Sequence, residues 1–179
     1  VALYLEKKLH QFFVGGREST SVMGAYSLAD DIAAMPTTEL LMPMNRVLFP
    51  ALVKVSNERT EFKRLYLLAQ SIHALIGIPA GIGLVLVAPE VVTWLLGEKW
   101  LIAIPFVQVL ALLGIVNAIV SSQLYVLLTL GNVRLLALLS ASQVVLFGGL
   151  AVFLIPGGGA LEISWLRLLV SLAGSALYV

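Results

Sequence analysis

The chain contains 179 residues, of which 60% are hydrophobic and 12% charged, and its mean hydropathy is +1.01. Soluble domains have about 45–50% apolar and roughly 25% charged residues, so one water-soluble core cannot bury this excess. The apolarity and the lack of cysteine exclude a disordered chain and a disulfide scaffold, and the net charge of +1 gives no reason to expect nucleic acid. We therefore predict an all-α integral membrane protein.

Residues 1–16 form the first and shortest predicted helix. Apolar side chains alternate there with Glu6, Lys7, Lys8 and His10. At about 1.5 Å per residue the segment reaches about 24 Å, less than the ~30 Å hydrocarbon core. This length, and the Val at the first position, predict the end of a longer span and hence a fragment of a longer protein.

Residues 20–53 form the second and most polar predicted helix, which contains Asp30, Asp31, Glu39 and Arg46. A charge at the bilayer centre costs about 2.5–3.5 kcal/mol, so these side chains should face protein or water. At about 100° per residue, most of the polar positions, Asn45 among them, share one side of the helix.

Prolines recur every seventh residue in this helix, at Pro36, Pro43 and Pro50. Each removes a backbone hydrogen bond and should bend the helix. The pattern predicts a bent helix that lines an aqueous cavity. The alternative is a kinked packing helix whose charges are satisfied by its neighbours and which binds no ligand.

The depth of the charges follows if the first two helices form an antiparallel hairpin. Lys7 and Lys8 then lie level with Asp30 and Asp31, which predicts a mixed-charge cluster towards the outer side that His10 is placed to join. Deeper in the membrane, Glu39 and Arg46 would need water, another helix or a substrate as partners.

The remaining predicted spans are 65–89, 101–130, 135–155 and 162–179, which gives a single domain over 1–179 built as a bundle of about six transmembrane helices. Residues 90–100 are too short to cross, and their tryptophans suit the headgroup layer, so we expect an interfacial segment; the alternative is that they merely end one span and begin the next. In span 65–89, the glycines indicate close helix contact, and His73 is either a proton relay or a hydrogen-bonded packing residue.

The orientation follows from the short loops, because cytoplasmic loops are rich in Lys and Arg. The loop 54–64 holds four such residues and is predicted to be cytoplasmic. Arg134 then also lies inside, whereas Arg17, Lys99 and Arg167 lie outside.

Signals for enzyme chemistry are absent from the sequence. No His, Cys and carboxylate group has metal-ligand spacing, and there is no nucleophile elbow or dinucleotide fingerprint. The loops are too small to place Asp30 and Asp31 around a metal and a sugar nucleotide. We expect that the protein is not an enzyme and binds no cofactor, and coupling of transport to H⁺ or Na⁺ stays open.

Residues 24–29 (GAYSLA), Pro36 and residues 45–52 (NRVLFPAL) resemble the eighth helix of the polysaccharide flippases. These are the O-antigen and exopolysaccharide exporters of the multidrug/oligosaccharidyl-lipid/polysaccharide superfamily. Residues 88–90 (APE) and 95–100 (LLGEKW) resemble the region after the ninth helix of that family. The resemblance implies helices seven to twelve of a twelve-helix protein, that is, a C-terminal lobe whose N-terminal lobe is missing.

The resemblance also implies a function: alternating-access export of a polyprenyl-pyrophosphate-linked oligosaccharide across the bacterial plasma membrane, for cell-surface polysaccharide. Lys7, Lys8 and Arg46 would meet pyrophosphate, while Asp30, Asp31, Glu39 and Asn45 would orient sugar hydroxyls or respond to a coupling cation. Where relatives often carry an Asp, this chain has Leu9-His10-Gln11, so no role of that acid carries over. The candidate cavity residues are Lys7, Lys8, His10, Asp30, Asp31, Glu39, Asn45 and Arg46.

The expected partners are the lipid-linked oligosaccharide, membrane lipids, the missing lobe and polysaccharide polymerase machinery. Three other functions stay open. A cation-coupled drug extruder of the same superfamily would have an apolar, aromatic cavity, and a polymerase or ligase would carry a long external loop with arginines. The third is a small scaffolding subunit of the membrane.

Overall fold

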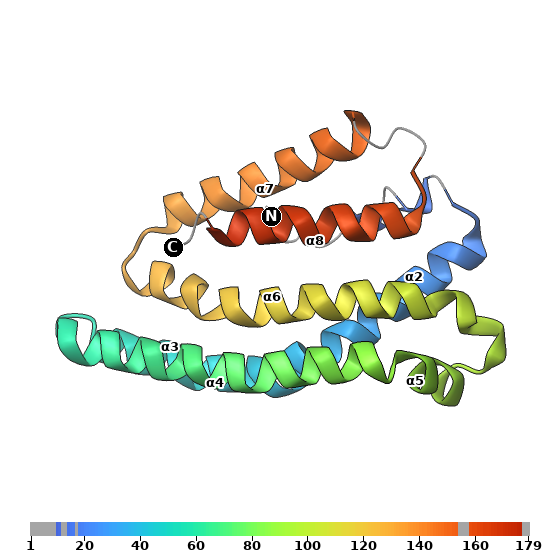
Figure 1. Cartoon of the computed structure of the whole chain (residues 1–179). Helices are drawn as coiled ribbons and strands as arrows, with labels where there is room; N and C mark the ends of the chain where they lie inside the picture. Colours follow the sequence, from blue (N-terminus) through green and yellow to red (C-terminus); the bar gives the residue numbers. More distant parts are fainter. Residues whose placement is uncertain (1–9, 12–13, 17, 154–157, 177–179) are drawn as a thin grey trace.

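The computed structural model describes residues 10–11, 14–16, 18–153 and 158–176, and over these residues the chain is helical without strands (Figure 1). The elements in chain order are α2 (Thr20–Met35), a π-helical segment (Pro36–Leu41), α3 (Met42–Lys54), α4 (Arg59–Leu86), α5 (Ala88–Leu95), a 3₁₀ segment (Glu98–Ala103), α6 (Ile104–Thr129), α7 (Val133–Phe153) and α8 (Ala160–Ala176).

Three stretches of this fold are long and apolar enough to cross a membrane: Arg59–Leu86, Glu98–Thr129 and Val133–Phe153. The prediction of an all-α integral membrane protein is confirmed. Most of the predicted helix 1–16 lies outside the described residues. The assignment of all six segments to one lobe stays a prediction.

Two predicted boundaries were wrong. The predicted loop 54–64 is mostly helix, because α4 begins at Arg59 and its first turns carry the charged residues. Hydropathy marks only the part of a helix that lies in hydrocarbon, and α4 extends beyond it into water. Likewise, residues 90–100 are split between α5, which begins at Ala88, and the 3₁₀ segment that leads into α6. On α5, Trp94 is 91% exposed, as the interfacial interpretation requires of a headgroup anchor.

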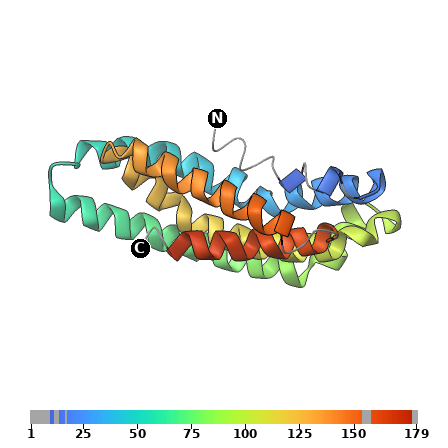
Figure 2. The same ribbon diagram turned by 90° about the horizontal axis from the view of Figure 1, so that it is seen from above.

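The longer helices of the described chain run lengthwise between the same two ends of the bundle (Figure 1). The α3–α4 connection and the α6–α7 turn lie together at one end, and α5 lies at the other. The cationic start of α4 and Arg134 therefore share one side, which agrees with the predicted orientation. Seen from above, α2 and α3 follow one edge of the bundle, and α7 crosses obliquely between them and α8 (Figure 2).

Helices α4 and α6 pack closely along their length, and the glycines of α4 make this possible. A Cβ added to Gly77 would collide with Ala118, and one added to Gly81 would collide with Ile115. Amide side chains add hydrogen bonds across the interface: Gln70 Nε2 donates to the Ile119 carbonyl at 3.2 Å, and Gln108 Nε2 to the Val85 carbonyl at 3.3 Å. Small residues and polar side chains hold membrane helices together because lipid supplies no hydrophobic force between them. The predicted close contact of this span is confirmed.

The close approach predicts that Gly77→Ala lowers the stability of the bundle by about 1–3 kcal/mol, the usual cost of overpacking. Gly83 on the same helix is the matched control, because nothing lies within 4 Å of a Cβ placed there. Gly83→Ala should leave stability unchanged or raise it by up to about 1 kcal/mol through helix propensity. Thermal unfolding in detergent measures both variants, and equal midpoints would contradict the packing.

Candidate substrate cavity

A cavity of about 550 Å³ lies between the α2–α3 edge of the bundle and helices α6, α7 and α8. Apolar side chains of α6 and α7, such as Leu113 and Phe147, form much of its wall. Polar groups enter from every side: His10, Asp30, Asp31, Thr37, Asn45, Asn117, Ser121, Ser140, Gln143, Arg167 and Ser171. A polar hollow of this kind among membrane-spanning helices indicates space for water or a polar ligand.

The π-helical segment interrupts the predicted second helix and itself contributes Thr37 and Leu41 to the cavity wall. It begins at Pro36, and its wider turn ends with the Met42 amide donating to the Thr37 carbonyl, five residues earlier. The Thr37 hydroxyl donates to the Ala34 carbonyl at 2.7 Å, which satisfies a carbonyl near the interruption. Asp30 and Asp31 before the π-helical segment and Asn45 after it all line one wall. The predicted bend is realised as a π-helix.

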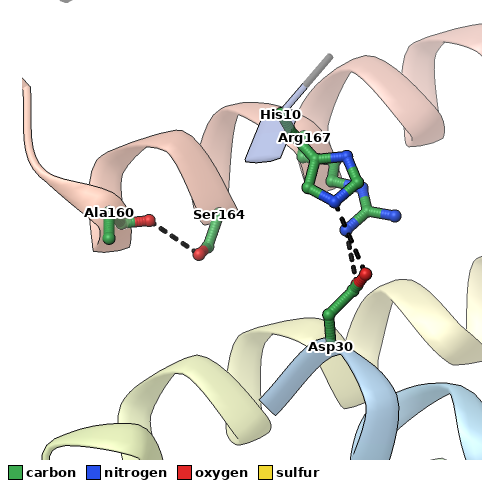
Figure 3. A network of polar contacts seen from close by, with 5 residues as sticks. All are labelled: His10, Asp30, Ala160, Ser164 and Arg167. Carbon is green, nitrogen blue, oxygen red and sulfur yellow. Dashed lines mark hydrogen bonds and ion pairs between the residues drawn. The ribbon is translucent and has the colours of Figure 1, made fainter. Parts of the chain in front are cut away.

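Asp30 is the centre of a charged cluster at one end of the cavity (Figure 3). Its Oδ1 accepts a hydrogen bond from Arg167 Nη1 of α8 at 2.7 Å, and its Oδ2 lies 3.4 Å from His10 Nε2. The His10 ring is buried, whereas the Asp30 and Arg167 side chains are 23% and 21% exposed. Next to them, Ser164 Oγ donates to the Ala160 carbonyl of its own helix at 2.8 Å. The carboxylate thus connects three segments that are distant in sequence.

The cavity gathers four of the eight predicted site residues: His10, Asp30, Asp31 and Asn45. Glu39 and Arg46 do not line it and are exposed. Lys7 and Lys8 lie outside the described residues, so their predicted place beside Asp30 stays a prediction. Within the described part, Asp30 does form a mixed-charge cluster, with Arg167 and His10 as partners.

Arg167 is the main cavity residue that the sequence prediction missed, because it was counted only as a charge on the outer side within span 162–179. The structure puts it within α8, seven residues beyond the helix start at Ala160. A signal existed, because Arg167 is a lone cation between apolar runs on both sides, and such a residue needs a partner inside the bundle. Asn117 and Gln143, which also line the cavity, were missed because uncharged amides barely interrupt an apolar run.

Breaking the Asp30–Arg167 pair should destabilise the bundle. Arg167→Met leaves a partly buried carboxylate without its strongest partner, and we expect a loss on the order of 3 kcal/mol. Adding Asp30→Asn removes the stranded charge and should recover most of the loss. Arg64→Ala is the control. Arg64 pairs with Glu61, their side chains are 80% and 50% exposed, and such exposed ion pairs contribute little to stability. Thermal midpoints of the four proteins measure this, and an equal drop for Arg64→Ala would contradict it.

Comparison with known proteins agrees with this architecture. The model of the family described as "Polysaccharide biosynthesis protein" matches residues 1–105. The chain belongs to this family. It is 31% identical over 168 residues to the teichuronic acid biosynthesis protein TuaB of Bacillus subtilis. The matched stretch covers 93% of this chain and 35% of TuaB. No solved structure matches the chain.

Two further relatives match shorter stretches. The lipopolysaccharide biosynthesis protein WzxC of Escherichia coli is 30% identical over 65% of this chain and 24% of its own length. An uncharacterized membrane protein in the cps region of Klebsiella pneumoniae is 32% identical over 51% of the chain and 19% of its own. The chain thus spans about a third or less of these relatives. It is a multi-pass membrane protein of the polysaccharide biosynthesis family, and its resemblance to the polysaccharide flippases is confirmed.

Proposed function

We propose that the chain forms one lobe of a transporter that moves a polyprenyl-pyrophosphate-linked oligosaccharide from the inner to the outer leaflet of the bacterial plasma membrane. The transport would proceed by alternating access and supply cell-surface polysaccharide. The observation that carries the proposal is the cavity of about 550 Å³, with carboxylates, amides and an arginine, inside a membrane bundle of a polysaccharide biosynthesis family.

The cavity chemistry suits a ligand with sugars and a pyrophosphate. Carboxylate and amide groups, such as Asp31 and Asn45, form hydrogen bonds with sugar hydroxyls. Arg167 presents five N–H donors, of which one is used at Asp30, so it joins Lys7, Lys8 and Arg46 as a candidate for pyrophosphate. Charges in the wall argue against the drug extruder, for which an apolar, aromatic cavity is expected.

A second lobe would account for the remaining charged residues. Glu39 and Arg46 are exposed on the π-helical segment and α3, outside the cavity. Facing lipid, each would cost about 2.5–3.5 kcal/mol. An N-terminal lobe packed against this face, with water between the lobes, would remove that cost, and the matched relatives are long enough to contain one.

The test is the membrane leaflet on which the lipid-linked oligosaccharide accumulates when the chromosomal gene is deleted. A transporter defect should strand finished oligosaccharide on the cytoplasmic leaflet, where enzymes added to inside-out vesicles reach it and those added to right-side-out vesicles do not. A polymerase or ligase defect would strand it on the outer leaflet instead, and a scaffold would give no fixed side. Either of these results would overturn the proposal.

Chromosomal variants then separate the role of Arg167 in binding from its role in folding. The double variant Asp30→Asn with Arg167→Met removes both charges and should remain folded, yet it should accumulate oligosaccharide on the cytoplasmic leaflet as the deletion does. Arg64→Ala should support normal surface polysaccharide, because its guanidinium is exposed outside the cavity. Normal output from the double variant would exclude Arg167 from binding.

A further inference from the structure

Two side chains away from the charged cluster connect the cavity to the helix behind it. Asn45 on α3 lines the cavity, is 5% exposed, and has its Oδ1 2.9 Å from Nε2 of His73 on α4. Nδ1 of the same ring lies 2.6 Å from the Ala69 carbonyl oxygen, one turn earlier on α4. His73 is fully buried, so the ring meets the cavity only through Asn45.

The Ala69 carbonyl determines which ring nitrogen carries a proton. A carbonyl oxygen only accepts hydrogen bonds, so Nδ1 must donate. In a neutral imidazole, Nε2 then has a lone pair and needs a donor, which Asn45 provides only through its amide nitrogen. In an imidazolium, Nε2 donates as well, and Asn45 accepts through Oδ1, the atom that faces the ring here. The orientation of the Asn45 carboxamide therefore depends on the number of protons on His73.

The same orientation decides what Asn45 offers to the cavity. A half-turn about χ2 exchanges the oxygen and nitrogen of a carboxamide without moving the rest of the side chain. With a neutral His73, the oxygen is left for the cavity and acts as an acceptor. With a protonated His73, the NH₂ group is left and acts as a donor.

We propose that His73 and Asn45 form a proton-dependent pair that positions a hydrogen-bonding group of the cavity. As the Asn45 carboxamide turns, one proton passes from cavity water to His73 Nε2, and its return to water reverses the change. This inference rests on the proposed function, because it takes the group that Asn45 binds in the cavity to be a sugar hydroxyl. A hydroxyl that donates to Oδ1 must reorient to accept from the NH₂ group, so the two states bind one ligand with different strength.

Other charged groups do not replace Asn45 at this ring. Among the described residues, no carboxylate forms an ion pair or hydrogen bond with His73. The titratable and charged side chains on the elements around it are Glu39 on the π-helical segment, Arg46 and Lys54 on α3, Tyr125 on α6, and Arg59, Glu61, Lys63, Arg64 and Tyr66 on α4. The ring therefore contacts the cavity wall through the neutral amide of Asn45.

Nitrogen-15 NMR of labelled histidine tests the pair directly. The chain has two histidines, so His10→Gln in the full chain, in lipid nanodiscs, leaves the signals of His73 alone. We expect Nδ1 to be protonated throughout and Nε2 to gain a proton only as the pH is lowered. A neutral ring with its proton on Nε2, or a ring that is the same at every pH, would overturn the proposal.

A substitution at position 45 tests the contact itself. In Asn45→Asp a carboxylate accepts from Nε2, so both nitrogens should stay protonated under conditions in which the parent has a proton on Nδ1 alone. If His73 titrates in this variant as in the parent, the ring does not sense residue 45 and the pair fails. This result does not depend on the ligand, so it is separate from any failure of the proposed transport.

The amount of surface polysaccharide made by chromosomal variants tests the pair in the cell. His73→Gln cannot titrate, and we expect about a tenfold loss of output, the size of one hydrogen bond to a buried group, together with loss of its dependence on medium pH. Ser71→Ala is the control on the same helix, because Ser71 is exposed and bonds only the Leu67 carbonyl. An unchanged pH profile in folded His73→Gln, checked by its thermal midpoint, would refute the coupling.

Discussion

Hydrocarbon does not solvate charge, and the Asp30–Arg167 ion pair shows how this bundle meets that constraint. Over the described residues, neither α2 nor α8 is among the three stretches that are both long and apolar enough to span, and each carries one member of the pair. Two carboxylate oxygens serve different partners, Arg167 and His10, so one acid joins three segments. Its attraction offsets the cost of placing both helices in the membrane. Both side chains line the cavity, and neither is fully buried.

The π-helical segment shows that the effect of a proline depends on its position in the helix. Pro36 stands at the start of the π turn and Pro43 at the start of α3, where a missing N–H costs little. Pro50 lies inside α3. The wider turn after Pro36 restores continuity and rotates α3 relative to α2. Asp30 before the π turn and Asn45 after it share a cavity wall.

The sequence was sufficient for features that depend on neighbouring residues and insufficient for those that depend on distant ones. Apolar runs predicted α4, α6 and α7, and the glycines of α4 predicted a close helix contact, which the structure shows to be with α6. The partner of Asp30 was sought in the adjacent segment, because hairpin geometry is the only tertiary relation that adjacency supplies. Arg167 is 137 residues away, and no periodicity connects the two. Likewise, the hydrogen bond between His73 and Asn45 requires the packing of α3 on α4, which the apolar pattern does not specify.

The depths of the polar groups give the cavity two different centres. At about 1.5 Å per residue, Asp30 lies roughly 15 Å from the start of α2 and Arg167 about 10 Å from the start of α8, both measured from the end with α5. Asn45 lies about 14 Å from the opposite end of the bundle. An ionic centre and a neutral amide–imidazole centre thus follow each other along one hollow. A wholly apolar ligand would satisfy neither centre, and a small anion would reach only the first. A ligand that carries a charged group and neutral hydroxyls in series, as a pyrophosphate-linked glycan does, matches both at once.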